Sequence, residues 1–271
     1  MSLDMTAFDS GFDLAVDHFW QTRDLAAQRQ RDRGGSDQGE RAGVTAGHNM
    51  DGFIHMFAEL ARANGLRDAQ IHTKKTLVTL PGYFRPTKTW DLVILKGDRL
   101  VAAIELKSQV GPSFGNNFNN RAEEAIGTAT DFWTAHREGA FGDPRPPFLG
   151  WLILVEDCPA SRRPSQRVVS PHFQALPEFH NASYLDRYDL LCRKLMRERL
   201  YTSAAVVAST RTAEGEGDQR SLSEGTSTHT FATAFAAASL LSDSGLPSHD
   251  LGPSSHRYHG LVSSVPGGSL E

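Results

Sequence analysis

Apolar side chains near the N-terminus recur at the spacing of amphipathic helices. One set consists of Phe8, Phe12, Ala15, Val16, Phe19 and Trp20, and the next of Met50, Phe53, Ile54, Phe57 and Ala61. Spacings of three and four residues place side chains on one face of a helix, so we expect two helices that each bury a face. The stretch between them, residues 28–41, is polar and broken by glycine, which predicts either a mobile loop or a segment that orders on binding.

Shorter apolar runs fill the middle of the chain. Residues 92–95 and 100–106 flank a Lys-Gly-Asp-Arg turn, a pattern that predicts a β-hairpin. Further along, the pattern predicts a buried strand at residues 148–156, a helix at 184–199 and another strand at 204–208. Because strands and helices alternate, we predict an α/β fold with a mixed central β-sheet flanked by helices.

Beyond Thr212 the sequence is rich in Ser, Thr, Gly and Ala. One apolar stretch, residues 230–241, predicts a helix that completes the core. We therefore expect a single folded domain over residues 1–241 and a disordered C-terminal tail over residues 242–271.

The length of 271 residues is enough for one α/β domain with a sizeable core. No apolar run is long enough to cross a membrane, and the N-terminus lacks a basic-then-apolar signal pattern, so a cytoplasmic location is the default expectation. Cys158 and Cys192 are the only cysteines. Their wide separation argues against a zinc site or a disulfide framework.

The net charge of −4 hides an uneven distribution. Residues 213–271 contain seven acidic residues and two arginines, so the remaining chain, with 26 basic and 25 acidic residues, carries +1. Residues 62–107 contain nine lysines or arginines against four acidic residues. Positive charge is therefore concentrated beside the predicted hairpin, where it could neutralise phosphate groups.

Three charged residues interrupt the apolar runs of the hairpin. Asp91 precedes the first run, and Glu105 and Lys107 lie at the end of the second, on one face by the period of two. A turn centred on Gly97 and Asp98 brings Asp91 opposite residue 104 or 105, and a one-residue bulge in the turn would select 105 and align all three side chains. Solvated edge positions or an ordinary ion pair are the alternative interpretation.

Charged groups inside apolar strands need compensation, because removing an ion from water is costly. A divalent cation is the simplest compensating ligand, and Mg²⁺ prefers carboxylate oxygens such as those of Asp91 and Glu105. Such an ion polarises a phosphoryl oxygen and lowers the pKa of its bound water, while a lysine can orient that water or stabilise transition-state charge. The pattern therefore indicates phosphodiester hydrolysis.

With this Asp91 and Glu105-Leu106-Lys107 core, the chain resembles the PD-(D/E)xK nuclease superfamily, and more narrowly the XhoI family of type II restriction endonucleases. The narrower likeness rests on ungapped stretches at residues 48–53, 80–88, 105–125, 150–158 and 187–195. A bare D…ExK match is weak evidence, whereas these stretches together are specific. Trp90 stands where the motif has proline, a position that commonly varies in the superfamily.

The resemblance implies a restriction-endonuclease-like core and a magnesium-dependent homodimer. It implies cutting of double-stranded DNA at the palindrome CTCGAG, after the first C, to leave four-base 5′ overhangs. Asp91, Glu105 and the backbone carbonyl of Leu106 would be metal ligands, and Lys107 would assist the attacking water. A cognate DNA methyltransferase, with no direct contact implied, would protect the host DNA.

Residues 110–120 contain two glycines, a proline and four asparagines, which predicts a loop, with Asn119 or Asn120 capping a helix that ends near residue 137. Amides pair with adenine and arginine pairs with guanine in the major groove. The candidate base-reading residues are therefore Asn116, Asn117, Asn119, Asn120 and Arg121. The alternative is that the asparagines only hold turns and caps.

Other basic residues are candidates for contact with the DNA backbone. Arg85 and Lys88, just before Asp91, are the candidate phosphate contacts, which position a protein without reading sequence. Residues 161–167 form a basic, proline-broken stretch that is either solvated or in contact with phosphate.

Asp51, His55 and Glu59 share one strip of the second predicted helix. Members of the superfamily often carry an additional metal-facing acid on such a helix, so Asp51 or Glu59 is an optional ligand. A solvated helix face is the preferred interpretation.

Two further functions fit the same residues. A repair or junction-resolving nuclease of the superfamily would use this metal site without a fixed palindrome. A DNA-binding protein that no longer cuts is the other, and the intact Asp91, Glu105 and Lys107 speak against it.

Overall fold

A computed structural model describes residues 2–32, 48–164, 170–211 and 217–243. Its helices are α1 (Thr6–Asp32), α3 (Asp51–Ala63), α4 (Phe114–Arg137), α5 (Pro159–Arg162), α6 (Tyr184–Arg197) and α7 (Thr228–Asp243), with 3-10 turns at Pro177–Phe179 and Glu224–Thr226. Its strands are β1 (Gln70–His72), β2 (Thr79–Pro81), β3 (Thr87–Thr89), β4 (Leu92–Lys96), β5 (Arg99–Gln109), β6 (Phe148–Glu156), β7 (Ser203–Arg211) and β8 (Gly217–Ser221).

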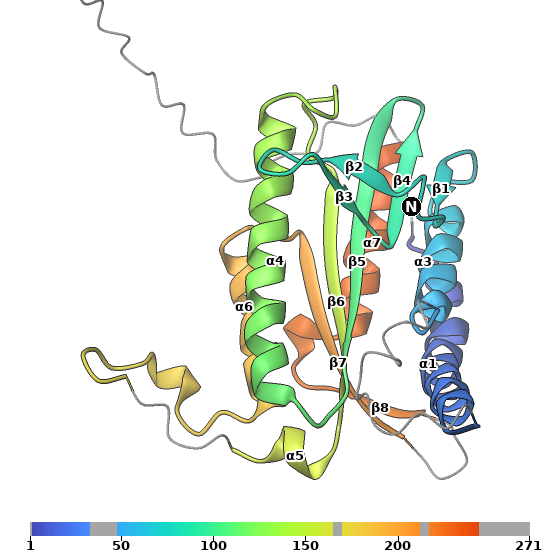
Figure 1. Cartoon of the computed structure of the whole chain (residues 1–271). Helices are drawn as coiled ribbons and strands as arrows, with labels where there is room; N and C mark the ends of the chain where they lie inside the picture. The colour runs from blue at the N-terminus through green and yellow to red at the C-terminus, as the bar shows by residue number, and fades with distance from the viewer. Residues whose placement is uncertain (1, 33–47, 165–169, 212–216, 244–271) are drawn as a thin grey trace, which may run out of the picture.

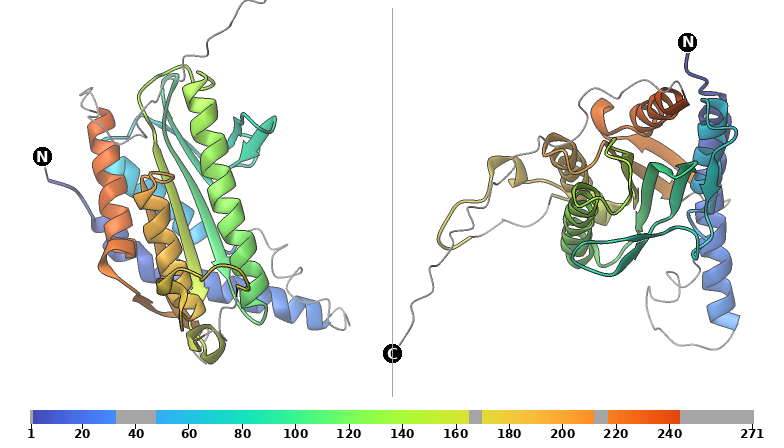
Figure 2. Two further views of the ribbon diagram at one scale, coloured as in Figure 1. Left: turned by 90° about the vertical axis from the view of Figure 1, so that its left-hand side faces the viewer. Right: turned by 90° about the horizontal axis from the view of Figure 1, so that it is seen from above.

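Six strands form one mixed sheet in the order β1-β4-β5-β6-β7-β8. The central strands β5, β6 and β7 run parallel, and β1, β4 and β8 pair antiparallel with their neighbours. Strands β2 and β3 form a separate antiparallel ribbon, which projects beside α4 (Figures 1 and 2). The predicted α/β fold with a mixed central sheet flanked by helices is confirmed.

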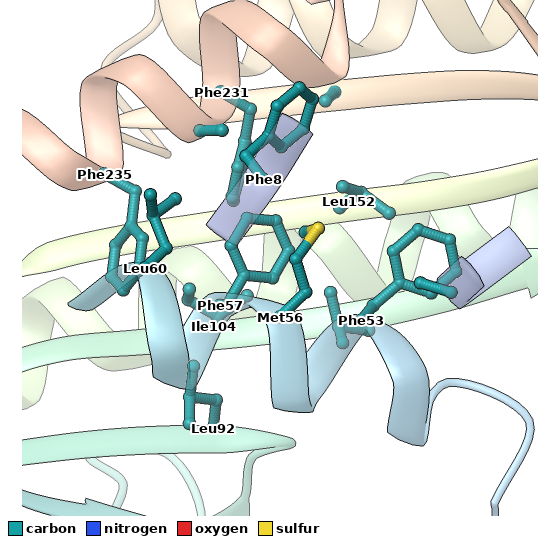
Figure 3. Packing of buried hydrophobic residues seen from close by; sticks show 14 of the residues in the cluster. Phe8, Phe53, Met56, Phe57, Leu60, Leu92, Ile104, Leu152, Phe231 and Phe235 are labelled. Carbon is teal, nitrogen blue, oxygen red and sulfur yellow. The ribbon is translucent and has the colours of Figure 1, made fainter. Parts of the chain in front are cut away.

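Helices cover both faces of the sheet with apolar side chains. On one face α1, α3 and α7 enclose an aromatic-rich core, in which Phe57 of α3 packs against Phe231 and Phe235 of α7 (Figure 3). On the other face α4 and α6 pack over a second core. Helix α6 begins with a capping box, in which Ser183 and the third helical residue exchange hydrogen bonds.

The two faces of β5 belong to different cores. Ile104 packs in the core under α3 and α7, whereas Ala103 packs in the core under α4 and α6. Since successive side chains alternate between faces, Glu105 and Lys107 lie on the α4 side of the sheet. This alternation decides which helices can reach the candidate site.

A β-bulge sets the register of the β4–β5 hairpin. Leu92 lies opposite Ile104, and the pairing shifts by one residue within β4. Continued by one residue, this register sets Asp91 opposite Glu105. A bulge thus selects residue 105 as predicted, but it lies in the paired strands, between Ile94 and Leu95, and the predicted location in the turn was wrong.

Helix α4 corrects the prediction for residues 110–120. The helix begins at Phe114, so only residues 110–113 form a loop. Ser113 is the residue before the helix, and the prediction that Asn119 or Asn120 caps it was wrong. Tertiary packing of the helix overrides the modest helix propensity of its asparagines.

Gly115 explains why this stretch looked like a loop. A Cβ at this position would lie 2.8 Å from the hydroxyl oxygen of Tyr184 at the start of α6. The glycine therefore allows close packing of two helices, and does not mark a turn.

The sequence also missed several boundaries and strands. Helix α1 continues through Asp32, and the rest of the predicted polar segment lies outside the described residues. Strand β8 lies in the Ser- and Gly-rich stretch where no strand was expected, and pairs with β7. Helix α7 ends at Asp243, and the predicted tail from residue 244 onward lies outside the described residues.

Two expectations about the chain as a whole can be compared with the described residues. None of the helices there combines the length and the apolar character that crossing a membrane requires. Cys158 and Cys192 are both free thiols.

Candidate active site

Two lysines and two carboxylates meet on the α4 side of β5. Lys107 Nζ lies 2.6 Å from Oε1 of Glu105, and Lys88 Nζ lies 2.8 Å from the same oxygen. Oδ2 of Asp91 accepts a 2.7 Å hydrogen bond from the backbone N–H of Leu106. The predicted Asp91, Glu105 and Lys107 are thus brought together, and Lys88 joins them.

The pKa values of the two carboxylates are shifted in opposite directions. The side chain of Glu105 is only 3% exposed. Burial alone would raise its pKa, but Lys107 and Lys88 outweigh burial and hold that pKa below the ordinary value. For Asp91, burial outweighs the hydrogen bond from Leu106 and the charge of Lys107, so its pKa is raised. Asp91 is therefore costly to ionise without a further cation.

One oxygen of Glu105 lacks a partner. Oε2 is buried and accepts no hydrogen bond within the described part of the chain, although Oε1 binds two ammonium groups. A buried carboxylate oxygen without a donor calls for a ligand. Together with the Asp91 carboxylate it fits the oxygen-rich surroundings that Mg²⁺ prefers.

The donor set is small for a metal site built from side chains alone. Among the described residues, no cluster of three or more His, Cys, Asp or Glu side chains could hold a metal ion. A cation at Asp91 and Glu105 would need backbone, water or phosphate oxygens as its remaining ligands. Mg²⁺ commonly binds in this way, through one or two carboxylates.

Strand β3 carries Lys88 into the site. In the β2–β3 ribbon Lys88 pairs with Leu80, and its ammonium group also donates to the carbonyl of Thr89 and lies 5.2 Å from the ring centre of Trp90. In sequence, a lysine on a three-residue polar strand looks solvated. Its partnership with Glu105 depends on how the ribbon folds over β5, and no local pattern encodes that fold.

Asp131 on α4 holds the tip of the same ribbon. Its Oδ1 accepts hydrogen bonds from the backbone N–H groups of Tyr83 and Phe84, at 2.8 and 2.7 Å, and its Oδ2 accepts one from Arg85 Nε at 2.7 Å. Burial alone would raise the pKa of Asp131, but these donors lower it below the ordinary value. Arg85, a predicted phosphate contact, is therefore engaged in an ion pair.

The candidate base-reading residues lie within the first turns of α4. Asn116, Asn119 and Asn120 are exposed, whereas Asn117 and Arg121 are half-buried. Arg121 forms an ion pair with Glu124 one turn further along, at 2.6 Å. Because the asparagines are inside a helix, holding a turn or cap does not account for them.

The acidic strip of α3 does not reach this site within the chain. The helix packs on the opposite face of the sheet, where Asp51 and Glu59 face solvent. Asp51 bonds to His48 at 2.8 Å, and Glu59 bonds to Arg62. The preferred interpretation, a solvated helix face, is confirmed. In the other basic stretch, Arg162 lies at the end of α5 and pairs with Asp157, and residues 165–167 lie outside the described residues.

Comparison with known proteins identifies the family of the chain. The profile of the family described as Restriction endonuclease XhoI matches residues 29–221. The chain belongs to the XhoI restriction endonuclease family. The matched region contains Asp91, Glu105, Lys107, Lys88 and the whole β2–β3 ribbon.

Individual relatives agree with the family match. Type II restriction enzyme XhoI of Xanthomonas vasicola is 56% identical over 197 residues, which cover 72% of this chain and 78% of that protein. Type II restriction enzyme AbrI of Azospirillum brasilense is 55% identical over 174 residues, 64% of this chain and 78% of that protein. Type II restriction enzyme BstVI of Geobacillus stearothermophilus is 52% identical over 180 residues, 65% of this chain and 80% of that protein.

No solved structure matches the chain. Its membership of the XhoI family makes it a type II restriction endonuclease, that is, a site-specific deoxyribonuclease with DNA as its substrate.

Proposed function

We propose that this XhoI-family endonuclease is a magnesium-dependent homodimer that cuts double-stranded DNA at CTCGAG. Cutting after the first C in each strand would leave 5′ TCGA overhangs. The base sequence and the cut position follow from the family resemblance, supported by relatives that are 52–56% identical. The homodimer follows from symmetry, because a palindrome has the two-fold axis of a dimer and two strands need two active sites.

The observation that carries the catalytic assignment is the buried, unpartnered Oε2 of Glu105 beside Asp91. Asp91, Glu105 and the backbone carbonyl of Leu106 would hold Mg²⁺. When bound, this ion polarises a phosphoryl oxygen and lowers the pKa of its water. The proposal thus explains why Glu105 is buried with one oxygen unsatisfied.

The protein side chains have separate tasks in this proposal. Lys107, 2.6 Å from Glu105, orients the attacking water and stabilises the negative charge that develops on the phosphate. Asp91 and Glu105 remain ionised during the reaction, and the two lysines balance their charge. Burial of Glu105 strengthens each of these interactions, since charges attract more strongly in a medium of low dielectric constant.

DNA contacts are assigned to two groups of residues. Lys88 and Arg85 would contact backbone phosphates, and Arg85 would do so beside its existing bonds to Asp131 and Thr128. The base-reading residues would come from the first turns of α4, namely Asn116, Asn117, Asn119, Asn120 and Arg121. Amide and guanidinium groups on a helix suit the major groove, where base edges present distinct donors and acceptors.

The cellular setting follows from the reaction. An enzyme that cuts DNA at CTCGAG requires a cognate methyltransferase to protect the host genome, and the cytoplasm is where both meet bacterial DNA. The proposal implies no direct contact between this chain and the methyltransferase.

The test is digestion of a plasmid that carries one CTCGAG, with and without Mg²⁺, followed by sequencing of the product ends. We expect one magnesium-dependent cut with a 5′ TCGA end. Discrete cuts at another sequence would overturn the recognition site, and cutting in EDTA would overturn the metal assignment. Random degradation would contradict site-specific cutting.

A further inference from the structure

The tip of the β2–β3 ribbon presents two exposed aromatic rings. Tyr83 is 53% exposed and Phe84 is 69% exposed, and their ring centres are 4.9 Å apart in an edge-to-face arrangement. Adjacent exposed aromatic residues are unusual on a protein surface and mark sites of interaction. Neither residue belongs to the catalytic group or to the predicted base-reading set.

Hydrogen bonds to Asp131 of α4 fix the backbone of this tip. The single carboxylate of Asp131, whose side chain is 6% exposed, accepts hydrogen bonds from both aromatic residues' N–H groups and from Arg85. A Cβ at Gly82 would lie 2.6 Å from Oδ2 of Asp131 and 2.6 Å from the carbonyl oxygen of Arg85, so only glycine fits the turn. The two rings therefore extend from a backbone whose conformation is held by hydrogen bonds.

The tip is connected to the catalytic group through one short strand. Lys88, whose ammonium group contacts Glu105, is four residues from Phe84. Four residues of extended chain span at most about 14 Å, which is close to the width of the DNA major groove, about 12 Å. A duplex whose scissile phosphate reaches Glu105 therefore comes within reach of the tip.

Charge along the ribbon matches the same ligand. Between residues 73 and 90 the chain carries Lys74, Lys75, Arg85 and Lys88 and no acidic residue. A surface that combines cations with exposed rings suits a nucleic acid, because phosphates neutralise the cations and the rings pack on sugars or bases.

We infer that Tyr83 and Phe84 contact the substrate duplex in a groove beside the scissile phosphate, with Asp131 as the residue that positions them. This inference rests on the proposed function and adds a third DNA-contacting element to the start of α4 and to the proposed phosphate contacts, Arg85 and Lys88. Insertion of aromatic or apolar side chains at a groove also bends or unstacks DNA in many complexes, so the tip contributes to recognition of the site's shape.

The test is the double variant Tyr83→Ala/Phe84→Ala, with Phe173→Ala as the matched control. Phe173 is 83% exposed and lies in another loop. Binding of a fluorescent duplex containing CTCGAG is measured by anisotropy in a Glu105→Gln background, which removes cleavage from the readout. We expect affinity to fall at least tenfold for the double variant, as is typical when stacking rings are lost, and to stay within threefold for the control.

Two outcomes would overturn the inference. Affinity of the double variant within threefold of the parent would show that the rings do not touch DNA. If the double variant sediments as a smaller species than its parent in analytical ultracentrifugation without DNA, the tip instead joins two copies of the chain. Phe84→Tyr keeps an aromatic ring at the tip and should therefore retain affinity for the duplex. Digestion of plasmid DNA by the wild-type enzyme tests the proposed function separately.

Discussion

The ammonium group of Lys88 lies 2.8 Å from Oε1 of Glu105, although the two residues come from different sheets. Lys107 reaches the same oxygen from β5. Two ammonium groups thus lie near two carboxylates, Asp91 and Glu105, and the four charges balance when both carboxylates are ionised. A divalent cation that joins the carboxylates would release Lys88 toward a phosphate, which gives this lysine a role in both states.

Replacing Lys88 tests that role. Lys88→Met should slow cleavage by at least tenfold, because a phosphate contact and a partner of a buried carboxylate are lost together. In EDTA it should also destabilise the fold by about 1–3 kcal/mol, since Glu105 keeps only Lys107. Single-turnover cleavage and urea unfolding measure the two effects, and Lys88→Arg should recover part of the activity. Full activity in Lys88→Met would refute the assignment.

Asp91 should reduce the stability of the metal-free enzyme. Its folded-state pKa is raised above the ordinary value of 3.8 by burial, so the folded state binds a proton more readily than the unfolded state does. The penalty is absent below the unfolded-state pKa and fully present above the folded-state pKa. Asp91→Asn should therefore stabilise the protein in EDTA near pH 8, with a gain that shrinks toward pH 4, while cleavage is abolished.

Urea unfolding of Asp91→Asn and the wild type at both pH values checks this sign. A variant that is less stable than the wild type near pH 8 would mean that the Asp91 carboxylate is favourable in the metal-free protein. The electrostatic account of the site would then be wrong.

Asp131 should matter to stability far more than its neighbour Thr128. Asp131→Ala removes the acceptor of hydrogen bonds from Tyr83, Phe84 and Arg85, and should cost about 1.5–3 kcal/mol, the range for hydrogen bonds to a charged group. Thr128 accepts only one 3.3 Å bond from Arg85, and Thr128→Val should cost less than about 1 kcal/mol. Denaturant unfolding compares them, and equal costs would contradict the bracing role of Asp131.

The sequence predicted the parts of the site that lie within one hairpin. Strand alternation and a turn link Asp91, Glu105 and Lys107, so local periodicity placed them within one residue of alignment. The bulge seen in the structure decides the register. Helices α1, α3, α6 and α7 followed equally from apolar spacing.

Local sequence patterns could not predict contacts between residues that only the tertiary fold brings together. Lys88 reaches Glu105 because a two-stranded ribbon folds over β5, and Asp131 reaches that ribbon from the middle of α4. The asparagine-rich start of α4 looked like a loop because Gly115 marks close packing against Tyr184, which is visible only when α6 is in place. The solvent-facing position of Asp51 and Glu59 likewise depends on which face of the sheet α3 covers.

The most direct test of the catalytic assignment compares Glu105→Gln with Glu59→Gln. Both changes remove one carboxylate charge, but Glu59 lies on the solvent face of α3 and pairs with Arg62. Each purified variant is incubated with Mg²⁺ and a plasmid carrying one CTCGAG, and its DNA binding is measured by gel shift. We expect Glu59→Gln to cut like the wild type and Glu105→Gln to bind the DNA without cutting it. Cutting by Glu105→Gln at the wild-type rate would contradict the catalytic role of Glu105.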